Sequence, residues 1–373
     1  MRFDAIVIGA GPGGAIAARL LAAGGWRVAL VEKDIFPRRK VCGEFLSTPT
    51  HAVLDACGAG EAFRELAGPM VRRIGLFSGG TVVTAPQKRD WGRALGREHL
   101  DTLLRDAAVA AGAILFQPAE LVGLARDGAA HLCRLKVVAD GTAIAAPIII
   151  AATGSWRNKP PLAVTAPEKP GDLLAFKAHF KGGALAPGLM PLLAFPGGYG
   201  GLVTSDGGRL SLSCCIRRDV LAALRRPGER AGDAVLRHLK DSTEGVAAAL
   251  ENAVLQDAVL AAGPIRPGMR SRFADGIFFT GNLAGEAHPV IAEGISMAMQ
   301  ASHLLARLLL AHDPAAGPAY AAAWRKRFGA RLAVAALFAQ AAMRARGPAT
   351  VLVKAAPSLL TWGAALSGKG TER

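Results

Sequence analysis

A glycine-rich turn near the start of the chain constrains the fold more than any other feature. Residues 3–14 read FDAIVIGAGPGG, and Glu32 follows at the end of a second apolar run, residues 26–31. Residues 5–8 are apolar and rich in β-branched side chains, which predicts a buried parallel strand, and residues 15–23 have the composition of a helix. Strand, glycine turn, helix, strand and acid in this order are typical of a Rossmann-like dinucleotide-binding unit.

Each glycine of the turn has its own role in this prediction. Gly9 permits the turn, Gly11 lets backbone N–H groups approach a pyrophosphate, and Gly14 lets helix and strand pack closely. The helix N-terminus supplies partial positive charge to the phosphates, and Glu32 is placed to bind an adenosine ribose. A glycine turn without a ligand is the alternative. The residues predicted to contact the dinucleotide here are Gly9, Gly11, Pro12, Gly13, Gly14, Glu32 and Lys33.

The net charge narrows the expected partners. The 44 Lys and Arg residues exceed the 29 Asp and Glu residues and give a formal charge of +15. No basic stretch alternates with stacking aromatic residues, so nucleic acid is not an expected partner. An anionic cofactor, an anionic substrate or a membrane surface accounts better for the excess.

Cysteine usage and hydropathy predict a cytoplasmic protein. The five cysteines form no CxxC pair, so we expect neither a disulfide framework nor a metal site. The N-terminus enters the first strand at once, which is unlike a signal peptide. No uninterrupted apolar run reaches the ~20 residues that span a bilayer.

A second informative segment lies at residues 278–299, which read FFTGNLAGEAHPVIAEGISMAM. Residues 277–281 predict a parallel strand, a loop carries Pro289, and a helix begins near Glu293 and Gly294. This segment resembles the flavoprotein superfamily of aromatic hydroxylases (p-hydroxybenzoate hydroxylase-like), flavin-dependent halogenases and geranylgeranyl reductases. The superfamily pattern GDAAG, three residues, P, two residues, GEGI is matched at Gly281, Ala284, Gly285, Pro289, Glu293, Gly294 and Ile295.

Two further motifs extend the resemblance over about residues 1–310. Arg97 with Leu100 and Asp101 matches the arginine helix of the superfamily, and residues 40–44, KVCGE, match a loop of its reductase and halogenase branch. The resemblance implies bound FAD, with the helix after Pro289 directed at the isoalloxazine ring. It assigns these further residues to the FAD site: Cys42, Gly43, Arg97, Thr153, Gly154, Gly281, Asn282, Pro289, Glu293, Gly294 and Ile295.

Departures from the family patterns leave the substrate open. Thr153 stands where many hydroxylases have the aspartate of Ala-Asp-Gly, and the Trp-x-Trp-x-Ile-Pro signature of the halogenases is absent. Asn282 stands where the family has aspartate, and because asparagine keeps an acceptor, FAD binding is expected to survive. The strand around Tyr199 keeps the tyrosine of the reductase branch and lacks its tryptophan and proline. The family's substrates therefore do not carry over to this chain.

The expected fold is α/β (α+β), with a Rossmann-like FAD-binding domain, an inserted antiparallel-sheet substrate domain and C-terminal helices. Short alternating strands at 173–216 predict the inserted sheet, and residues 132–138 and 142–150 predict a hairpin around Asp140 and Gly141. The predicted boundaries are residues 1–160 and 265–310 for the FAD-binding domain, 161–264 for the substrate domain, 311–373 for the C-terminal segment, and 70–95 as a stretch that can belong to the substrate side.

Three side chains are candidates for catalysis. His288 lies in the predicted loop beside the flavin and can exchange a proton. A purely structural role for this histidine is an equally good interpretation. Cys42 can face the isoalloxazine ring or be an inert thiol. Tyr199 can lie at the pocket wall or be an ordinary sheet residue.

The predicted activity is that of an FAD-dependent monooxygenase that hydroxylates a small apolar aromatic or polyketide-like substrate through a flavin C4a-hydroperoxide. A reductase acting on a carbon–carbon bond is the close alternative, favoured by the 40–44 loop. A non-catalytic nucleotide-binding interaction protein is the alternative from another class. The sequence contains no second GxGxxG unit, so we expect NAD(P)H as a transient electron donor or a partner reductase.

The C-terminal segment has a character of its own. Residues 320–343 predict a long basic helix or helix pair with an apolar face of Leu332, Val334, Leu337 and Phe338. This helix is expected to cap the substrate domain. The alternative is contact with a membrane surface or a carrier protein, since basic amphipathic helices make both.

Overall fold

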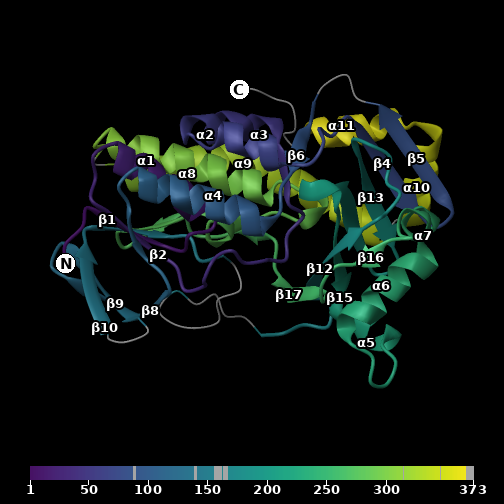
Figure 1. The fold of residues 1–373 in the computed structure, drawn as a ribbon, viewed down its shortest axis with the longest axis horizontal. Coiled ribbons are helices and arrows are strands. Elements are labelled where there is room, and N and C mark those ends of the chain that lie inside the picture. Colours follow the sequence, from purple (N-terminus) through teal and green to yellow (C-terminus); the bar gives the residue numbers. More distant parts are fainter. Residues whose placement is uncertain are drawn as a thin grey trace.

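A computed structural model describes residues 1–86, 90–137, 141–154, 162, 167–313, 315–344 and 346–366. It confirms the predicted α/β class, with two main sheets side by side and helices packed along both (Figure 1). The boundary predicted at 160/161 lies outside the described residues.

The first sheet has six strands in the order β19-β20-β11-β1-β2-β7 and is parallel except for β19. Its strands are β1 (Ala5–Ile8), β2 (Val28–Val31), β7 (Ile114–Phe116), β11 (Ile148–Ala151), β19 (Phe273–Ala274) and β20 (Ile277–Phe279). Both faces of β1 are buried, as a covered parallel sheet requires. Val7 packs towards α1 (Pro12–Ala23) and α8 (Gly294–Leu310), whereas Ile6 packs towards an antiparallel sheet on the other face.

That antiparallel sheet consists of β8 (Ala119–Asp127), β9 (Ala130–Val137) and β10 (Gly141–Ala146). The predicted single strand 142–150 is wrong, because the structure divides it at Pro147. β10 pairs with β9, and β11 instead pairs with β1. Proline has no N–H to donate to a ladder, so the chain changes sheets there. Asp140 of the predicted turn lies outside the described residues.

The second sheet has eight strands in the order β16-β12-β15-β14-β13-β4-β5, and β17 also pairs with β12. Its strands are β4 (Arg73–Ser78), β5 (Thr81–Pro86), β12 (Leu173–Lys181), β13 (Leu189–Phe195), β14 (Gly198–Thr204), β15 (Leu210–Arg217), β16 (Val254–Leu255) and β17 (Leu260–Ile265). β4 joins through a parallel pairing with β13, so residues 73–86 lie in the same sheet as strands about a hundred residues later in the chain. One face packs on α5 (Arg218–Leu224), α6 (Ala231–Ser242) and α7 (Glu244–Ala249).

Further elements lie outside the two main sheets. They are β3 (Phe45–Ser47), α2 (His51–Ala56), α3 (Gly60–Leu66), β6 (Gly92–Ala94), α4 (Arg97–Ala110), β18 (Gly268–Met269) and β21 (Gly285–Glu286). α4 packs beside α1, and β3 pairs with β6.

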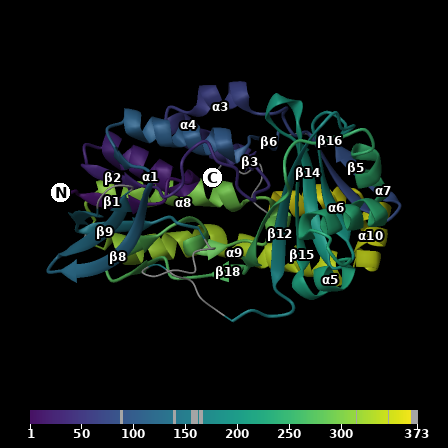
Figure 2. The same ribbon diagram turned by 60° about the horizontal axis from the view of Figure 1, so that its bottom comes forward.

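Three helices end the described chain: α9 (Ala316–Arg344), α10 (Arg346–Ala355) and α11 (Ser358–Leu366). α9 runs along both sheets, from α8 to β13 and β14 (Figure 2). Its buried side chains are Tyr320, Trp324, Phe328, Leu332, Ala335, Ala339 and Ala342. The predicted apolar face is therefore partly wrong, since Leu337 is 64% exposed. The buried stripe follows a spacing of three and four residues, which leaves position 337 outside.

Candidate cofactor and substrate site

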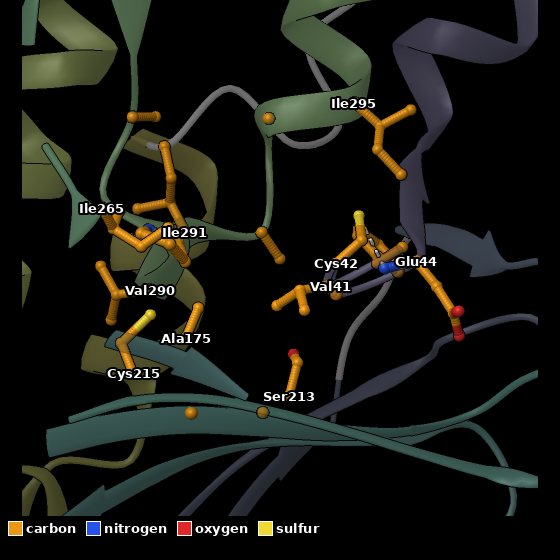
Figure 3. A pocket seen from close by; sticks show the side chains of 18 of the residues that line it. Val41, Cys42, Glu44, Ala175, Ser213, Cys215, Ile265, Val290, Ile291 and Ile295 are labelled. Carbon is orange, nitrogen blue, oxygen red and sulfur yellow. Dashed lines mark hydrogen bonds between the residues drawn. The ribbon is translucent and has the colours of Figure 1, made fainter. Parts of the chain in front are cut away.

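One continuous cavity of about 740 Å³ reaches from the glycine turn after β1 to α10 and α11. Its size is in the ordinary range for cofactor and ligand pockets. Figure 3 shows side chains from residues 41–44, from the eight-stranded sheet and from residues 290–295 arranged around part of this space.

The glycine turn has the close packing that its sequence predicts. Gly9 has φ +104°, and a Cβ there would lie 2.6 Å from the carbonyl oxygen of Ala152. A Cβ on Gly14 would lie 1.8 Å from the Gly9 carbonyl oxygen. A Cβ on Gly11 would instead meet no atom closer than Nη2 of Arg97, at 3.7 Å. Gly11 is therefore open towards the cavity, and backbone N–H groups at the start of α1 can face an anion there.

Glu32 supports this turn from the end of β2. Its Oε2 accepts a hydrogen bond of 2.9 Å from the Ala10 N–H, and its Oε1 accepts one of 2.9 Å from the Asp34 N–H. The side chain is 5% exposed and lines the cavity. A carboxylate fixed by two backbone donors is held ready to accept further hydrogen bonds from a ribose.

A buried aspartate orients two arginines beside the glycine turn. Asp101 accepts hydrogen bonds of 2.7 and 2.8 Å from Arg97 and one of 2.9 Å from Arg38. Burial by itself would lower the pKa of Arg97, but Asp101 outweighs it, and the pKa lies above the ordinary arginine value. Arg97 is thus a permanent cation on the cavity wall, suited to a phosphate or a ribityl hydroxyl.

The other end of the cofactor region is formed by the second glycine segment. Gly281 has φ +61° and Ala292 has φ +51°, and α8 begins directly afterwards at Gly294. A Cβ on Gly294 would meet nothing within 4 Å. The Oγ1 of Thr153 is buried and has no hydrogen-bond partner among the described residues. The open N-terminus of α8 fits the polar edge of a flavin. Thr153 lies instead beside the first glycine turn, since its Cα would be 3.2 Å from a Cβ on Gly9, and its unpaired hydroxyl can face the cofactor there.

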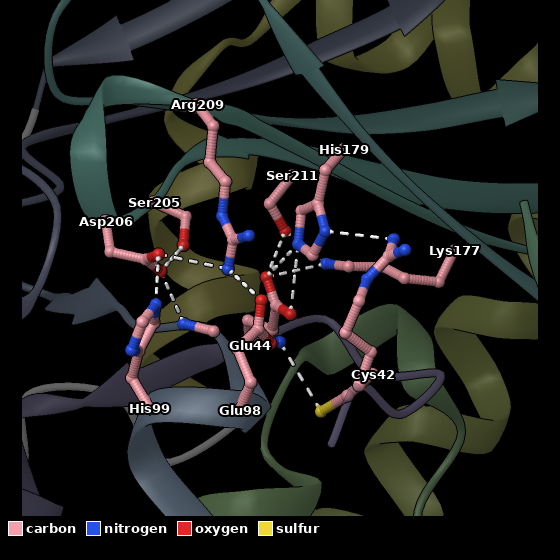
Figure 4. Close-up of polar contacts among 12 residues, drawn as sticks. Cys42, Glu44, Glu98, His99, Lys177, His179, Ser205, Asp206, Arg209 and Ser211 are labelled. Atoms are coloured by element: carbon pink, nitrogen blue, oxygen red, sulfur yellow. Dashed lines mark hydrogen bonds and ion pairs between the residues drawn. The ribbon is translucent and has the colours of Figure 1, made fainter. Parts of the chain in front are cut away.

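The KVCGE loop is fixed by a buried polar cluster, which we call the Glu44 cluster: Glu44, Lys177, His179 and Ser211 (Figure 4). Glu44 has φ +61°, and its carboxylate lies 2.8 Å from Lys177 Nζ and 2.9 Å from His179 Nε2. Ser211 Oγ donates to the same carboxylate at 2.9 Å. The loop carries Cys42, which lines the cavity and whose Sγ accepts a hydrogen bond of 3.4 Å from the Glu44 N–H.

Two of the three catalytic candidates touch each other. The Tyr199 hydroxyl lies 3.2 Å from Nδ1 of His288, with Cys215 beside the same hydroxyl. Burial raises the pKa of Tyr199 well above its ordinary value, and burial lowers the pKa of His288. Tyr199 therefore keeps its proton. Nδ1 of the neutral His288 ring can accept a hydrogen bond from the Tyr199 hydroxyl when Nε2 carries the ring proton.

Most of the predicted site residues line the cavity, and three do not. Gly14 lies behind the turn, where its role is packing. His288 is not a lining residue, but it contacts Tyr199, which is. The Glu293 side chain is fully buried behind the N-terminus of α8, where its Oε2 accepts a hydrogen bond of 3.0 Å from Ser47 Oγ. Sequence reasoning missed the partners of Glu44 on β12 and β15, and it missed the contribution of α10 and α11 to the cavity wall.

Comparison with known proteins identifies the cofactor. Residues 2–182 match a family model described as an FAD binding domain. A menaquinone reductase from Mycobacterium tuberculosis is 31% identical over 154 residues, 41% of this chain and 38% of that protein. A digeranylgeranylglycerophospholipid reductase from Methanothrix thermoacetophila is 26% identical over 89% of this chain and 85% of its own length. The first of these matches thus spans well under two thirds of the relative.

Solved structures share the fold at low identity. A flavin-dependent brominase has a TM-score of 0.79 at 18% identity, covering 99% of this chain and 94% of its own. A myxobacterial chondrochloren halogenase has a TM-score of 0.77 at 21% identity, covering 88% and 80%. A geranylgeranyl bacteriochlorophyll reductase-like protein from Thermoplasma acidophilum has a TM-score of 0.70 at 17% identity, covering 90% and 85%. Residues 2–182 therefore match an FAD-binding domain, the cofactor is FAD, and the chain shares its fold with flavin-dependent halogenases and a geranylgeranyl reductase-like protein.

Proposed function

We propose that the protein is an FAD-dependent reductase of a carbon–carbon double bond in a long apolar, isoprenoid-like or aromatic compound. The observation that carries this proposal is the single cavity that joins the FAD cradle to an apolar wall. Sequence similarity to two reductases, one of them along most of the chain, supports the same reaction class.

The chain supplies binding and orientation at the cofactor end. Bound FAD supplies two-electron transfer to or from a substrate carbon. Gly11 and the start of α1 would hold the pyrophosphate, and Arg97 would lie beside it. The N-terminus of α8 would favour negative charge on the flavin ring, because partial positive charge accumulates at a helix start.

The substrate end is apolar. Side chains from the eight-stranded sheet and from the C-terminal helices line it, among them Met190, Leu192, Val203, Phe338, Leu352 and Leu360. Such a surface favours hydrocarbon and aromatic compounds over small polar metabolites. The described lining residues therefore support an apolar substrate, as the sequence predicted.

Reduction of a double bond needs one hydride at one carbon and one proton at the other. Tyr199 lies on the cavity wall and keeps its proton. His288, which is half-buried, contacts the Tyr199 hydroxyl. We propose that Tyr199 delivers the proton and that His288 replaces it from outside the cavity. Cys42 is the second candidate donor, since it lines the same space.

The electrons are proposed to come from NAD(P)H bound transiently or from a partner reductase. The sequence holds one GxGxxG unit, and FAD would occupy it. In either case the protein would be reduced before it meets its substrate.

The monooxygenase predicted from the sequence is the second candidate. The Tyr199 and His288 pair favours it as well, because a neutral imidazole relayed through a phenol can take a proton from an aromatic hydroxyl. The same apolar wall would exclude water from an oxygen-dependent reaction.

An oxygen-controlled turnover experiment separates the two reactions. FAD-loaded protein is reduced with dithionite under nitrogen and mixed with an isoprenoid alcohol or an alkylphenol. Reduction predicts flavin reoxidation without O2 and a product heavier by two hydrogens. A requirement for O2, with labelled oxygen in the product, would overturn the reductase and support the monooxygenase. No product from either compound class, with or without O2, would overturn both.

A further inference from the structure

We infer that α10 and α11 form a docking surface for a bilayer that contains anionic lipid. The five apolar side chains exposed on this hairpin are Val351 (69% exposed), Leu352 (59%), Leu359 (39%), Trp362 (71%) and Leu366 (56%). Neither helix contains a buried residue. The other large exposed apolar side chains of the described residues are spread along the rest of the chain, whereas these five are concentrated in two consecutive helices.

The geometry of the hairpin fits a surface position better than a membrane span. The helices have 10 and 9 residues and meet at an angle of 113°. Each is therefore about 15 Å long, half the ~30 Å thickness of a hydrocarbon core. Within the described chain, no single helix is long and apolar enough to cross a bilayer. An exposed tryptophan is typical of side chains at the headgroup level.

The charge around the hairpin selects the lipid. Residues 314–371 contain no Asp or Glu, and their eight basic residues are Arg325, Lys326, Arg327, Arg331, Arg344, Arg346, Lys354 and Lys369. Of these, Arg346 and Lys354 lie on α10 and Arg344 ends α9 directly before it, and Arg344 and Lys354 are exposed. Basic side chains beside an apolar helical face favour binding to anionic headgroups. This segment has no acidic side chain that a negatively charged membrane would repel.

The hairpin also borders the substrate end of the cavity. Val353, Leu360 and Ala364 of the same helices line the cavity, and so do four of the five exposed side chains: Leu352, Leu359, Trp362 and Leu366. Thr350 Oγ1 donates to Ser78 Oγ at 3.0 Å, which links α10 to β4. An apolar compound dissolved in the bilayer would thus reach the cavity without crossing water. This last step rests on the proposed function, whereas the docking itself does not.

A vesicle co-sedimentation experiment with the full FAD-loaded chain tests the docking. Vesicles of phosphatidylcholine alone are compared with vesicles of phosphatidylcholine mixed with phosphatidylglycerol. We expect binding to the mixed vesicles, weakened by salt. The double variant Val351→Ser, Trp362→Ser should bind about tenfold more weakly or worse. Arg344→Glu with Lys354→Glu should remove the preference for phosphatidylglycerol.

The matched control is Leu66→Ser with Val109→Ser, which removes two exposed apolar side chains far from the hairpin in sequence. It should bind vesicles like the parent, and flavin absorbance and melting temperature show that each variant is folded. Equal binding by parent and hairpin variant would overturn the inference. A dimer that the hairpin variant dissociates, without vesicle binding by the parent, would also overturn it and assign the patch to a second copy. Vesicle binding is scored without turnover, so failure of the proposed reaction leaves a positive result intact.

Discussion

Nζ of Lys177 lies 2.8 Å from Oε2 of Glu44, and the two side chains are 0% and 1% exposed. Glu44 belongs to the cofactor-side loop, and Lys177 belongs to β12 of the eight-stranded sheet. The pair therefore joins the two halves of the cavity. It also holds Glu44 at φ +61°, a conformation that a residue with a Cβ rarely adopts.

Glu44→Gln is expected to destabilise the protein by about 3–5 kcal/mol, because it leaves the Lys177 charge buried without its partner. Chemical denaturation of the FAD-free protein measures this change. Asp233→Asn is the control, since it removes an ion pair with Arg230 whose two side chains are 42% and 74% exposed. The control should unfold at the denaturant concentration of the parent. A Glu44→Gln protein as stable as the control would show that the buried pair contributes nothing net.

The same pair predicts an acid-dependent loss of stability. Burial alone would raise the pKa of Glu44, but Lys177 and a hydrogen bond from His179 hold it well below its ordinary value. The folded protein then binds fewer protons than the unfolded chain, so the contribution is full above the ordinary glutamate pKa of about 4.3. It is lost as the pH falls through that value towards the folded pKa. Below about pH 4.5, the free energy of unfolding should therefore depend less on pH for Glu44→Gln than for the parent.

Gly11→Val is expected to abolish FAD binding, because its side chain would enter the open space in front of α1. Absorbance of the purified protein and FAD released on denaturation measure occupancy. Gly171→Val is the matched control, since a Cβ there meets nothing within 4 Å, one on Gly11 meets only Arg97 Nη2 at 3.7 Å, and Gly171 lies outside the cavity. Full flavin occupancy in Gly11→Val would contradict the placement of the pyrophosphate.

The cofactor half of the fold was readable from local sequence. The strand at 5–8 and the helix that starts at Gly294 lie where the motifs predict them, because each motif combines a turn with an apolar strand or helix in a few residues. The break at Pro147 was missed because strand length alone does not show which sheet a strand joins. The proline itself was the available signal.

The site was readable only where its residues are close in sequence. Glu44 and Lys177 are more than a hundred positions apart, and no periodicity or motif links them. The contact of Tyr199 with His288 is of the same kind, although both had been singled out separately. The cavity wall from α10 and α11 was missed because short apolar helices carry no chemical motif.

Gly294→Pro is expected to lower the flavin reduction potential by about 10–40 mV. Proline is compatible with the first position of α8 but removes the N–H of a residue that lines the cavity. A helix-start interaction with a partly buried charge is worth about 0.5–2 kcal/mol, and 30 mV corresponds to about 1.4 kcal/mol for two electrons. Gly294→Ala keeps the N–H while adding a side chain, so its potential should stay nearer the parent's. Equal potentials for the two variants would argue against a flavin at this helix start.

Tyr199→Phe is expected to lower kcat by about 10²–10⁴-fold while FAD stays bound, because it removes the proposed proton donor and keeps the ring that fills the cavity wall. Stopped-flow absorbance under nitrogen measures flavin oxidation by substrate. Tyr320→Phe is the matched control: Tyr320 is also fully buried, and its hydroxyl donates to the Phe279 carbonyl oxygen at 3.0 Å within the core. It should cost stability and leave kcat unchanged.

Because burial holds the Tyr199 pKa well above 10, the parent should show no loss of activity from tyrosine ionisation up to that pH. A Tyr199→Phe enzyme with parental kcat would remove Tyr199 from the reaction. Cys42→Ala would then decide whether the thiol on the opposite loop supplies the proton.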